Sequence, residues 1–381
     1  MMSKPRILLF ADWFEPGYKA GGPIRSCVHF VHRMKDRYTV YVITTDRDLN
    51  DTVPYKGIVA DKWVDYEQDV KVFYCSPLQL SWQNIRAQVQ HIQPEFIYLN
   101  SMFSKYFTIY PLVMARFGKI NAKIVLAPRG MLRESALQFK ATKKKIYLQV
   151  FRKLGLHRRI HFHATDKTEE NDIQKHFGKD MYLTVVSNFP GLLDKYPGTL
   201  EKKVNELSIV FIGRLHPVKG LDFLLKCVAS LQGKISITII GNAEDESYTA
   251  QCMDIAGKFP SNILVQFAGE IPNTHLPAII AKHHVFALPT KGENFGHAIY
   301  EALAAGRPVL ISDQTPWRGL NEAQAGWDLP LQQPALFTEV LQLAVAFNQP
   351  EYDAWSQGAW QFAKRFVDNV DLKEEYNKLF S

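Results

Sequence analysis

Short apolar runs that alternate with helix-length segments constrain the fold of this chain more than any other feature. Most runs are continuous in apolar residues, which indicates strands buried on both faces of a sheet. In the first half of the chain the runs are RILLFAD, YTVYVITTD, VKVFYC, EFIYLNS, AKIVLAPRG, IHFHATD and YLTVVSN. Helical patterns such as PIRSCVHFVHRMK and KKKIYLQVFRKL separate several of them. The alternation predicts an open parallel sheet with helices on its faces.

The alternation is interrupted once and then restarts, which predicts two doubly wound α/β domains in the 381 residues. The interruption contains prolines, glycines and charges without a clear period, so we place a linker at residues 191–206. The first domain then covers residues 1–190 and the second residues 207–365. The second set of runs is LSIVFIGRL, ISITIIGN, ILVQFAGEI, HHVFALPT and RPVLISD. A closing helix at about 366–381 is a candidate to pack back on the first domain.

Composition argues against several classes of protein. Four cysteines, at positions 27, 75, 227 and 252, have no short paired spacing, which argues against a disulfide framework or a zinc site. No segment approaches the roughly 20 apolar residues of a membrane-spanning helix, and the N-terminus does not resemble a secretory signal. We therefore expect a cytoplasmic protein.

Charge is distributed unevenly along the chain. Residues 1–190 contain 29 Lys and Arg and 17 Asp and Glu, a net charge of +12, whereas the remainder has a net charge of −5. A basic half attracts anionic partners. Charge alone does not choose among nucleic acid, anionic lipid and a phosphorylated substrate.

Ligands of open parallel sheets bind at the carboxyl ends of the strands, so we expect chemistry in the loops that follow strands. The loop after RILLFAD carries Gly21 and Gly22 directly before a helix that Pro23 would open. A glycine pair there lets the backbone approach a bound anion closely. An ordinary tight turn explains the pair equally well.

The loop after the first strand of the second domain carries two cations. In FIGRLHPVKGLDFLL, Arg214 ends the strand and Lys219 stands where the next helix begins. Two cations that converge on one helix N-terminus would neutralise a pyrophosphate. Their joint placement favours this interpretation over two solvated side chains.

A third loop, in GENFGHAIYEALAAGRPVL, has carboxylates on both sides of a helix start. Gly296 marks the start of the helical run, with Glu293 in the loop before it and Glu301 on the helix. The first turn of a helix has unpaired N–H groups and a partial positive charge, which suit a phosphate. The pattern predicts an anion cradle flanked by two carboxylates.

These stretches resemble the donor-binding half of the retaining glycosyltransferases of family 4. The resemblance rests on GRLHPVKGLDFLL followed by LPTKGENFGHAIYEALAAGRPVLISD and is strong over residues 207–315. It is looser in the first half, where AGGPIRS, LAPRGMLRESAL and FHATDKTE match. The resemblance implies the GT-B fold, in which two doubly wound Rossmann-like domains face each other across a cleft. It also implies sugar transfer with retention of the anomeric configuration.

The resemblance further implies roles for the residues of the third loop. Glu293 would lie against the donor sugar as a catalytic carboxylate, and Glu301 would accept hydrogen bonds from the ribose hydroxyls. Backbone N–H groups around Phe295, Gly296 and His297 would hold the distal phosphate.

The remaining donor-binding roles fall on the other two loops. Arg214 and Lys219 would neutralise the leaving diphosphate, and the Gly21–Gly22 turn would abut the phosphates from the first domain. Fixed cations and helix N–H groups can stabilise that charge without a metal, so we expect neither a metal site nor a cofactor. Asp46 and Asp48 form a D-x-D sequence like that of metal-dependent transferases of another fold. Here it follows a strand of a Rossmann-like domain, and we expect a polar loop.

Two residues of the first domain are candidates for catalysis on the acceptor side. Arg129 stands in LAPRG, where related transferases often carry histidine. Arginine cannot act as a general base, but it can bind a phosphate or a carboxylate. His163, in FHATD, is a second candidate, although a buried histidine satisfied by the backbone is the simpler interpretation.

A basic stretch at residues 140–162 has apolar residues at helical spacing. We expect these apolar positions to face the core. The cations beside them form either a solvated face or a surface that meets anionic lipid headgroups. The apolar positions are Ile146, Tyr147, Val150, Phe151 and Leu154.

We therefore predict a cytoplasmic, metal-independent retaining glycosyltransferase. It would move a sugar from a nucleotide-diphosphate sugar to a hydroxyl of a glycan or a polyprenyl-diphosphate-linked glycan, in cell-surface polysaccharide synthesis. A peripheral position at the inner membrane face is a further expectation, and nucleic acid is not an expected partner. The alternatives are a GT-B phosphorylase, a nucleotide-sugar epimerase, and a nonenzymatic protein that binds polysaccharide or nucleic acid.

Overall fold

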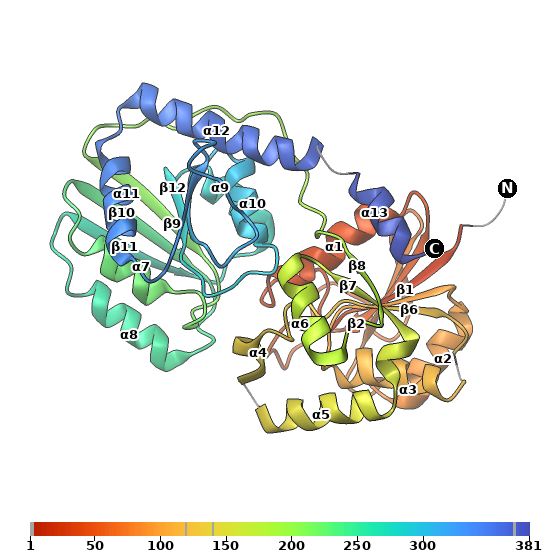
Figure 1. The fold of residues 1–381 in the computed structure, drawn as a ribbon. Helices are drawn as coiled ribbons and strands as arrows, with labels where there is room; N and C mark the ends of the chain where they lie inside the picture. Colours follow the sequence, from red (N-terminus) through yellow and green to blue (C-terminus); the bar gives the residue numbers. More distant parts are fainter. Residues whose placement is uncertain (1–3, 119, 139–140, 369–370) are drawn as a thin grey trace. The chain divides into compact units, whose positions relative to one another are not determined.

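The chain folds into two compact units, each built around one sheet with helices on both faces (Figure 1). The computed structural model describes residues 4–118, 120–138, 141–368 and 371–381. Unit 1 comprises Met1–Phe189 and Asp371–Ser381, and unit 2 comprises Pro190–Val370. The prediction of two doubly wound Rossmann-like domains is confirmed.

Unit 1 contains an eight-stranded sheet with the order β3-β4-β2-β1-β5-β6-β7-β8. Neighbouring strands are parallel, apart from the edge strand β3, which pairs antiparallel with β4. The strands are β1 (Arg6–Phe10), β2 (Thr39–Thr45), β3 (Trp63–Glu67), β4 (Val70–Cys75), β5 (Phe96–Leu99), β6 (Lys123–Leu126), β7 (Ile160–Ala164) and β8 (Tyr182–Val185).

The two faces of this sheet carry separate cores, because successive residues of a strand point to opposite faces. In β1, Ile7 and Leu9 enter one core and Leu8 and Phe10 the other, and all four are fully buried. Burial on both faces is the reason that the strand sequences are nearly continuous in apolar residues.

Each core of unit 1 is covered by its own helices. Helices α1 (Gly22–Met34) and α13 (Leu372–Leu379) pack on the core of Ile7 and Leu9. The opposite core is covered by α2 (Trp82–Ile92), α3 (Tyr110–Arg116), α5 (Ala141–Lys153) and α6 (Lys167–Phe177). The short helices of the unit are α4 (Glu134–Gln138), the π-helical turn η1 (Lys105–Ile109) and the 3-10 turn η2 (Leu156–Arg159).

Unit 2 contains a six-stranded, fully parallel sheet with the order β11-β10-β9-β12-β13-β14. Counted within the unit, this is the order 3-2-1-4-5-6 of nucleotide-binding Rossmann folds. The strands are β9 (Glu206–Ile212), β10 (Lys234–Ile240), β11 (Ile263–Gly269), β12 (Val285–Leu288), β13 (Val309–Ser312) and β14 (Gly326–Leu329).

Helices lie on both faces of this second sheet, as Figure 1 shows. One layer contains α7 (Leu221–Val228), α8 (Glu246–Ala256) and α11 (Pro334–Ala346), in which α7 contacts the other two. The other layer contains α9 (Leu276–Ile280), α10 (His297–Ala304) and α12 (Gln349–Asp368), in which α10 contacts the other two. The 3-10 turn η3 (Asn273–His275) precedes α9.

Residues 191–206, which we predicted to be a linker, are part of unit 2 and pack against it. Lys202 is buried, and its Nζ donates hydrogen bonds to the carbonyls of Phe347 and Val345 at 3.0 and 3.1 Å. Burial lowers the pKa of Lys202 to about 8. Leu193 and Leu200 also pack against the core of unit 2, but these scattered contacts form no regular apolar face, which is why the segment lacks a period.

The closing segment forms two helices. α12 belongs to unit 2 and ends at Asp368, whereas α13 belongs to unit 1. Residues 369–370, inside the predicted closing helix, lie outside the described residues. In α13, the ring of Tyr376 stacks on Phe189 at 4.3 Å between centroids, and Asn377 accepts a hydrogen bond from Tyr38 at 3.2 Å. These contacts place α13 on the first unit.

Helix α5 differs from its prediction. Leu148 and Phe151 face the core, but Ile146, Val150 and Leu154 are exposed. The predicted apolar stripe is wider than the single buried face of this helix, so part of it faces solvent. No helix within the described ranges is both long and apolar enough to cross a membrane.

Candidate functional site

The two predicted donor loops of unit 2 lie at the position where the strand order of the sheet reverses. β9 and β12 are hydrogen-bonded neighbours, and residues 213–220 and 289–296 follow their carboxyl ends. In open parallel sheets ligands bind at this position, because the chain leaves the two strands toward opposite faces and opens a crevice. The fold therefore brings Lys219 and Glu293 to the same sheet edge.

Backbone contacts hold the two loops together. Lys291 N donates to Val218 O at 2.7 Å, and the Thr290 hydroxyl donates to the same carbonyl at 3.1 Å. Gly220 has a φ of +71°, and a Cβ atom there would lie 2.2 Å from Pro289 O. Only glycine permits this approach, so the spacing between the loops is fixed by backbone rather than by flexible side chains.

The cations of the first loop are paired with carboxylates. Lys219 Nζ forms an ion pair with Glu293 Oε1, and each of these side chains is only 15% exposed. Arg214 instead forms an ion pair with Glu244 Oε2 at 2.5 Å, in the loop after β10. The two cations follow the same strand, but they do not share one partner. Sequence reasoning missed Glu244, because only the strand order places the loops after β9 and β10 side by side.

Gly296 and its neighbours determine how the chain enters α10. Gly296 is the N-cap residue with a φ of +79°, a conformation that L side chains rarely adopt. The buried ring of Phe295 lies 4.7 Å from the ring of His297 and 5.3 Å from that of Trp317. The Trp317 indole N–H also donates to the Phe295 carbonyl.

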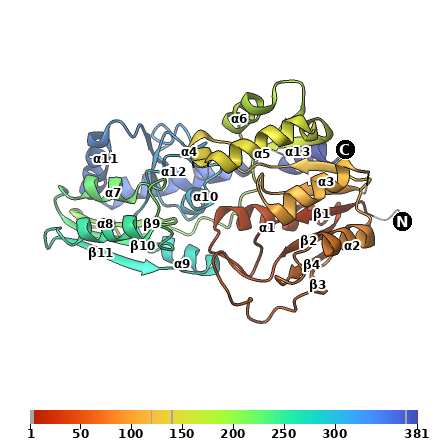
Figure 2. The same cartoon turned by 90° about the horizontal axis from the view of Figure 1, so that it is seen from below.

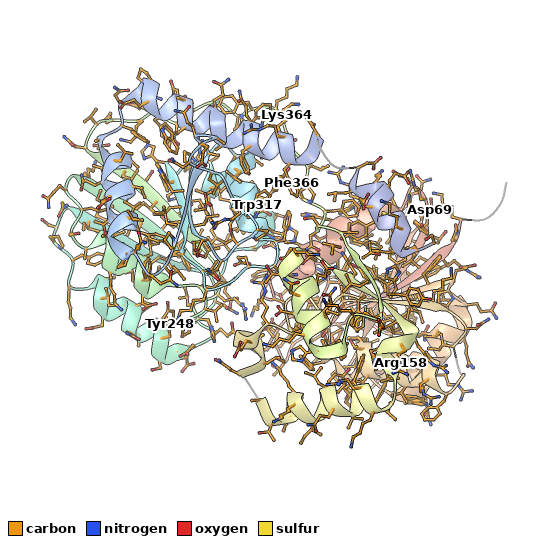
Figure 3. All side chains as sticks on the ribbon, viewed as in Figure 1. Asp69, Arg158, Tyr248, Trp317, Lys364 and Phe366 are labelled. Carbon is orange, nitrogen blue, oxygen red and sulfur yellow. The ribbon has the colours of Figure 1, made fainter. Side chains whose placement is uncertain are left out.

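This aromatic cluster continues into α12, where Phe366 lies 4.9 Å from Trp317; Figure 3 labels both side chains. The cluster anchors the residues on either side of the N-cap. The first-turn N–H groups of α10 are therefore held in a fixed direction, as an anion site requires. Sequence reasoning missed Trp317, because it lies outside the motif that contains Phe295.

Glu301 is half-buried on α10, five residues after the N-cap. At a rise of 1.5 Å per residue, this is about 7.5 Å along the helix axis. Glu293 lies three residues before the N-cap. The two carboxylates therefore lie on either side of the first helical turn.

In unit 1, Gly21 is the N-cap of α1, with a φ of +66° and no atom within 4 Å of where its Cβ would lie. Gly22, the first residue of α1, is exposed. The loop before them is held by Asp48, whose carboxylate accepts from Tyr18 N at 2.7 Å and Lys19 N at 3.0 Å. Gly21 thus leaves open space beside the backbone at the carboxyl edge of β1. Both glycines belong to unit 1, whereas the other predicted donor-binding residues belong to unit 2.

The D-x-D sequence has a structural role in this loop. Asp46 pairs with Arg47 at 2.8 Å, and Asp48 organises the loop before α1. Both aspartates are buried. Across the described parts of the chain, no group of three His, Cys, Asp or Glu side chains is arranged to hold a metal ion.

Arg129 lies at the carboxyl end of β6 and is bound by neutral oxygen atoms. Its guanidinium donates to Tyr98 Oη at 2.8 Å, to Asn100 Oδ1 at 2.6 and 3.1 Å, and to Asn188 Oδ1. The backbone of Arg129 has a φ of +56°. These contacts orient the side chain within unit 1, and each of these four hydrogen bonds goes to a neutral oxygen rather than to a carboxylate.

His163 does not support the catalytic role considered from the sequence. It is fully buried, and its ring nitrogens contact Tyr98 Oη at 2.7 Å and Val186 O at 2.8 Å. Burial, and then the nearby Arg129 charge, lower the pKa of His163 to about 3. A neutral ring with both nitrogens occupied inside the core cannot exchange protons with a substrate. His163 therefore orients Tyr98, and through it Arg129.

Two carboxylates of unit 1 were missed by sequence reasoning. Asp12 follows β1 and accepts a hydrogen bond from the Ser104 hydroxyl at 2.6 Å, and burial raises the pKa of Asp12. Glu169 is buried on α6 and accepts from Gly130 N at 2.6 Å, which fixes the turn that contains Arg129. The position of Asp12 at the end of the first strand was the available signal. Glu169 had none, because it lies inside an ordinary helical pattern.

Comparison with known proteins associates unit 2 with one family. Residues 194–342 match the family model described as glycosyl transferases group 1. Phosphatidyl-myo-inositol mannosyltransferase of Mycolicibacterium smegmatis is 29% identical over 146 residues, which are 37% of this chain and 35% of that protein. D-inositol 3-phosphate glycosyltransferase of Jonesia denitrificans is 28% identical over 172 residues, 42% of this chain and 39% of that protein. The chain spans little more than a third of the length of these two curated relatives.

Solved structures match over nearly the whole chain, with low sequence identity. Sucrose-phosphate synthase from Thermosynechococcus elongatus has a TM-score of 0.72 at 16% identity, with 99% of each chain covered. Anabaena HepE in complex with UDP and glucose has a TM-score of 0.68 at 15% identity, with 98% of each chain covered. WaaG, a glycosyltransferase involved in lipopolysaccharide biosynthesis, has a TM-score of 0.65 at 15% identity and the same coverage. The fold is therefore GT-B, and its second unit carries the sequence pattern of glycosyl transferases group 1.

Proposed function

We propose that this protein is a retaining glycosyltransferase that moves a sugar from a nucleotide-diphosphate sugar to a hydroxyl of a glycan or a lipid-linked glycan. The observation that carries the proposal is the joining of Lys219, Glu293 and the start of α10 at the strand-order reversal of unit 2. That edge combines a cation, a carboxylate and a helix N-terminus, which are the groups that a nucleotide-diphosphate sugar requires.

Each group matches a part of the donor. Glu301 binds the ribose hydroxyls, the first-turn N–H groups of α10 bind the distal phosphate, and Glu293 contacts the sugar ring. Transfer breaks the bond between the anomeric carbon and a diphosphate oxygen, and the electron pair goes to the diphosphate. Lys219 and Arg214 stabilise that charge without a metal or a cofactor. The oxygen of the acceptor hydroxyl forms the new bond to the anomeric carbon, and its proton goes to the departing diphosphate oxygen.

The Lys219–Glu293 ion pair suggests how the site changes when the donor binds. In the structure the Lys219 ammonium and the Glu293 carboxylate neutralise each other, and both side chains are largely shielded from solvent. An arriving diphosphate competes with Glu293 for the ammonium group. Lys219 then moves its hydrogen bond to phosphate, and the Glu293 carboxylate becomes available to the sugar hydroxyls.

The acceptor class is inferred from the relatives and from charge. Two relatives are named for transfer to inositol-containing acceptors, and WaaG is named for lipopolysaccharide biosynthesis. The net charge of +12 in residues 1–190 favours an anionic acceptor such as a polyprenyl-diphosphate-linked glycan. Together these observations favour a role in cell-surface polysaccharide synthesis at the cytoplasmic side of a membrane.

A two-step experiment tests the proposal. Thermal unfolding is first measured with a panel of nucleoside diphosphates and nucleotide sugars, because a ligand that binds only the native state raises the midpoint. UDP is the first probe, since HepE was solved with it. At a fixed nucleotide concentration, Lys219→Ala and Glu301→Ala should reduce the shift, whereas Lys282→Ala and Glu339→Ala, at exposed positions of unit 2, should retain it. No shift with any nucleotide would refute the donor site.

The second step measures nucleoside diphosphate release with and without acceptor glycans. Release that requires an acceptor hydroxyl supports transfer. Turnover of the sugar without any separate acceptor hydroxyl would favour a phosphorylase or an epimerase. Nucleotide binding without turnover under any condition would favour a nonenzymatic binding protein.

A further inference from the structure

Three aliphatic side chains of unit 1 point into solvent along one side of α5. Ile146, Val150 and Leu154 are 55%, 47% and 44% exposed. Their spacing of four residues places successive side chains about 40° apart around a helix axis, so they form a continuous stripe. The buried residues Leu148 and Phe151 hold the opposite side of the helix on the core. The stripe is therefore a consequence of how the helix docks and not of fraying.

A fourth exposed apolar side chain follows the neighbouring helix α3. Phe117 is 68% exposed and comes directly after Arg116, whose Nε donates to Leu154 O at 3.3 Å. Figures 1 and 2 show α5 on the outer side of unit 1. We call Ile146, Val150, Leu154 and Phe117 the α5 patch.

Cations surround the α5 patch. From residue 135 to residue 165 the chain contains eight Lys and Arg and no Asp or Glu. Lys143, Lys145 and Lys153 are exposed on α5, and Arg158 follows in η2, where Figure 3 labels it. Lys144 differs from its neighbours, since its Nζ donates to Ala136 O at 2.7 Å and lies 5.2 Å from the Phe103 ring centroid. The three consecutive lysines are thus not equivalent.

Aliphatic side chains among cations fit an anionic lipid surface better than other partners. Such a surface accepts apolar side chains below the headgroups and attracts the lysines at headgroup level. A second copy of the chain would bring two of these cation-rich stretches together, and their like charges repel. A single-stranded nucleic acid stacks its bases on several aromatic rings, whereas three of the four side chains of the α5 patch are aliphatic and only Phe117 is aromatic.

We propose that α5 is an interfacial helix that docks unit 1 on anionic membranes, with Ile146, Val150 and Leu154 inserted below the headgroups. The cations alone would give binding that salt abolishes, because screening shortens from about 10 Å at 0.1 M to about 3 Å at 1 M. The aliphatic stripe adds a contribution that salt does not screen. This inference does not depend on the proposed sugar transfer, because vesicle binding is measured without donor or acceptor.

The test is cosedimentation of the full chain with vesicles of phosphatidylglycerol and phosphatidylcholine, and of phosphatidylcholine alone, at 0.1 M and 0.5 M salt. The wild-type protein should bind the anionic vesicles and lose part of that binding at high salt. The variant Ile146→Ser/Val150→Ser/Leu154→Ser should bind at least tenfold more weakly at both salt concentrations. The variant Lys143→Gln/Lys145→Gln/Lys153→Gln should bind at least tenfold more weakly at low salt.

Leu264→Ser is the matched control, since Leu264 is 62% exposed on β11 of unit 2 and should not affect binding. Circular dichroism and the thermal midpoint verify that each variant is folded. Absence of wild-type binding to anionic vesicles at low salt would overturn the proposal. Full binding by the folded serine variant would overturn insertion. A wild-type dimer that the serine variant dissociates would instead identify the patch as an interface between copies.

Discussion

The Lys219–Glu293 ion pair predicts that substitutions of its two members change the affinity for the nucleoside diphosphate in opposite directions. Lys219→Ala removes a charged donor to the diphosphate. A hydrogen bond that involves a charged group contributes about 1.5–3 kcal/mol, so affinity for the nucleoside diphosphate should fall by about 10- to 150-fold. Glu293→Gln removes the carboxylate that competes for the same ammonium group, and the diphosphate then meets an uncompensated lysine.

The magnitude for Glu293→Gln follows from the burial of the pair. Exposed ion pairs contribute about 0.2–1 kcal/mol, and a pair with both side chains 15% exposed lies near the upper end of that range. Release of about 1 kcal/mol corresponds to about fivefold tighter binding of the nucleoside diphosphate. Turnover should nevertheless fall, because Glu293 no longer contacts the sugar as a carboxylate.

Isothermal titration calorimetry with UDP, or with the diphosphate that gives the largest thermal shift, measures both effects. Lys282→Ala and Glu339→Gln serve as controls at exposed positions of unit 2. The reasoning is refuted if Glu293→Gln weakens binding as strongly as Lys219→Ala does. Equal weakening would mean that the pair acts as one structural unit and not as competing partners of the ligand.

Three further predictions follow from single residues. Gly220→Ala places alanine in the left-handed region at φ +71° and ψ +30°, which by itself costs about 1–2 kcal/mol. The loss of stability in urea titrations should exceed that amount, because the added Cβ would meet Pro289 O, and a smaller loss would contradict this. His284 Nδ1 accepts from Ser208 N at 3.0 Å, and burial lowers the pKa of His284 to about 4. Below about pH 6.5, His284 therefore binds a proton in the unfolded state but stays neutral in the folded state. This difference should lower the free energy of unfolding by about 3 kcal/mol between pH 6.5 and 4. His284→Asn should show a shallower acid slope of the unfolding midpoint, and an unchanged slope would contradict the assignment. Activity should survive EDTA, and a loss that Mn²⁺ or Mg²⁺ restores would show that a metal takes part.

The fold was predictable because both sheets are buried on two faces. The central strands of each sheet are therefore apolar runs, as Ile7 to Phe10 illustrate, and the helices between them complete the alternation. Edge strands such as β3 and β8 are more exposed and show this pattern less clearly. Segments held by scattered contacts were not predictable in this way. Residues 191–206 seemed to be a linker because Leu193 and Leu200 on the core and the hydrogen bonds of Lys202 to backbone carbonyls leave no regular period in the sequence.

The candidate donor site was partly predictable for a similar reason. Gly296 and the carboxylates around it are close in sequence, so the helix start and its flanking charges could be placed from local rules alone. The residues that contact these groups from other parts of the chain could not be predicted. Glu244 and Trp317 reach the site through strand order and aromatic packing, and neither leaves a local signal.

The sequence by itself therefore determined the alternation, the count of two sheets and the helix start at Gly296 between two carboxylates, because each depends on neighbours within a few turns of chain. Only the tertiary structure decided which charged side chains form ion pairs and which side chains are buried. It paired Lys219 with Glu293 across 74 residues and buried His163 beside Tyr98. It also turned Ile146 outward and Phe151 inward on the same helix. Those outcomes depend on which strand lies next to which and on how each helix is rotated on its sheet, and these are properties of the packed chain rather than of any local pattern.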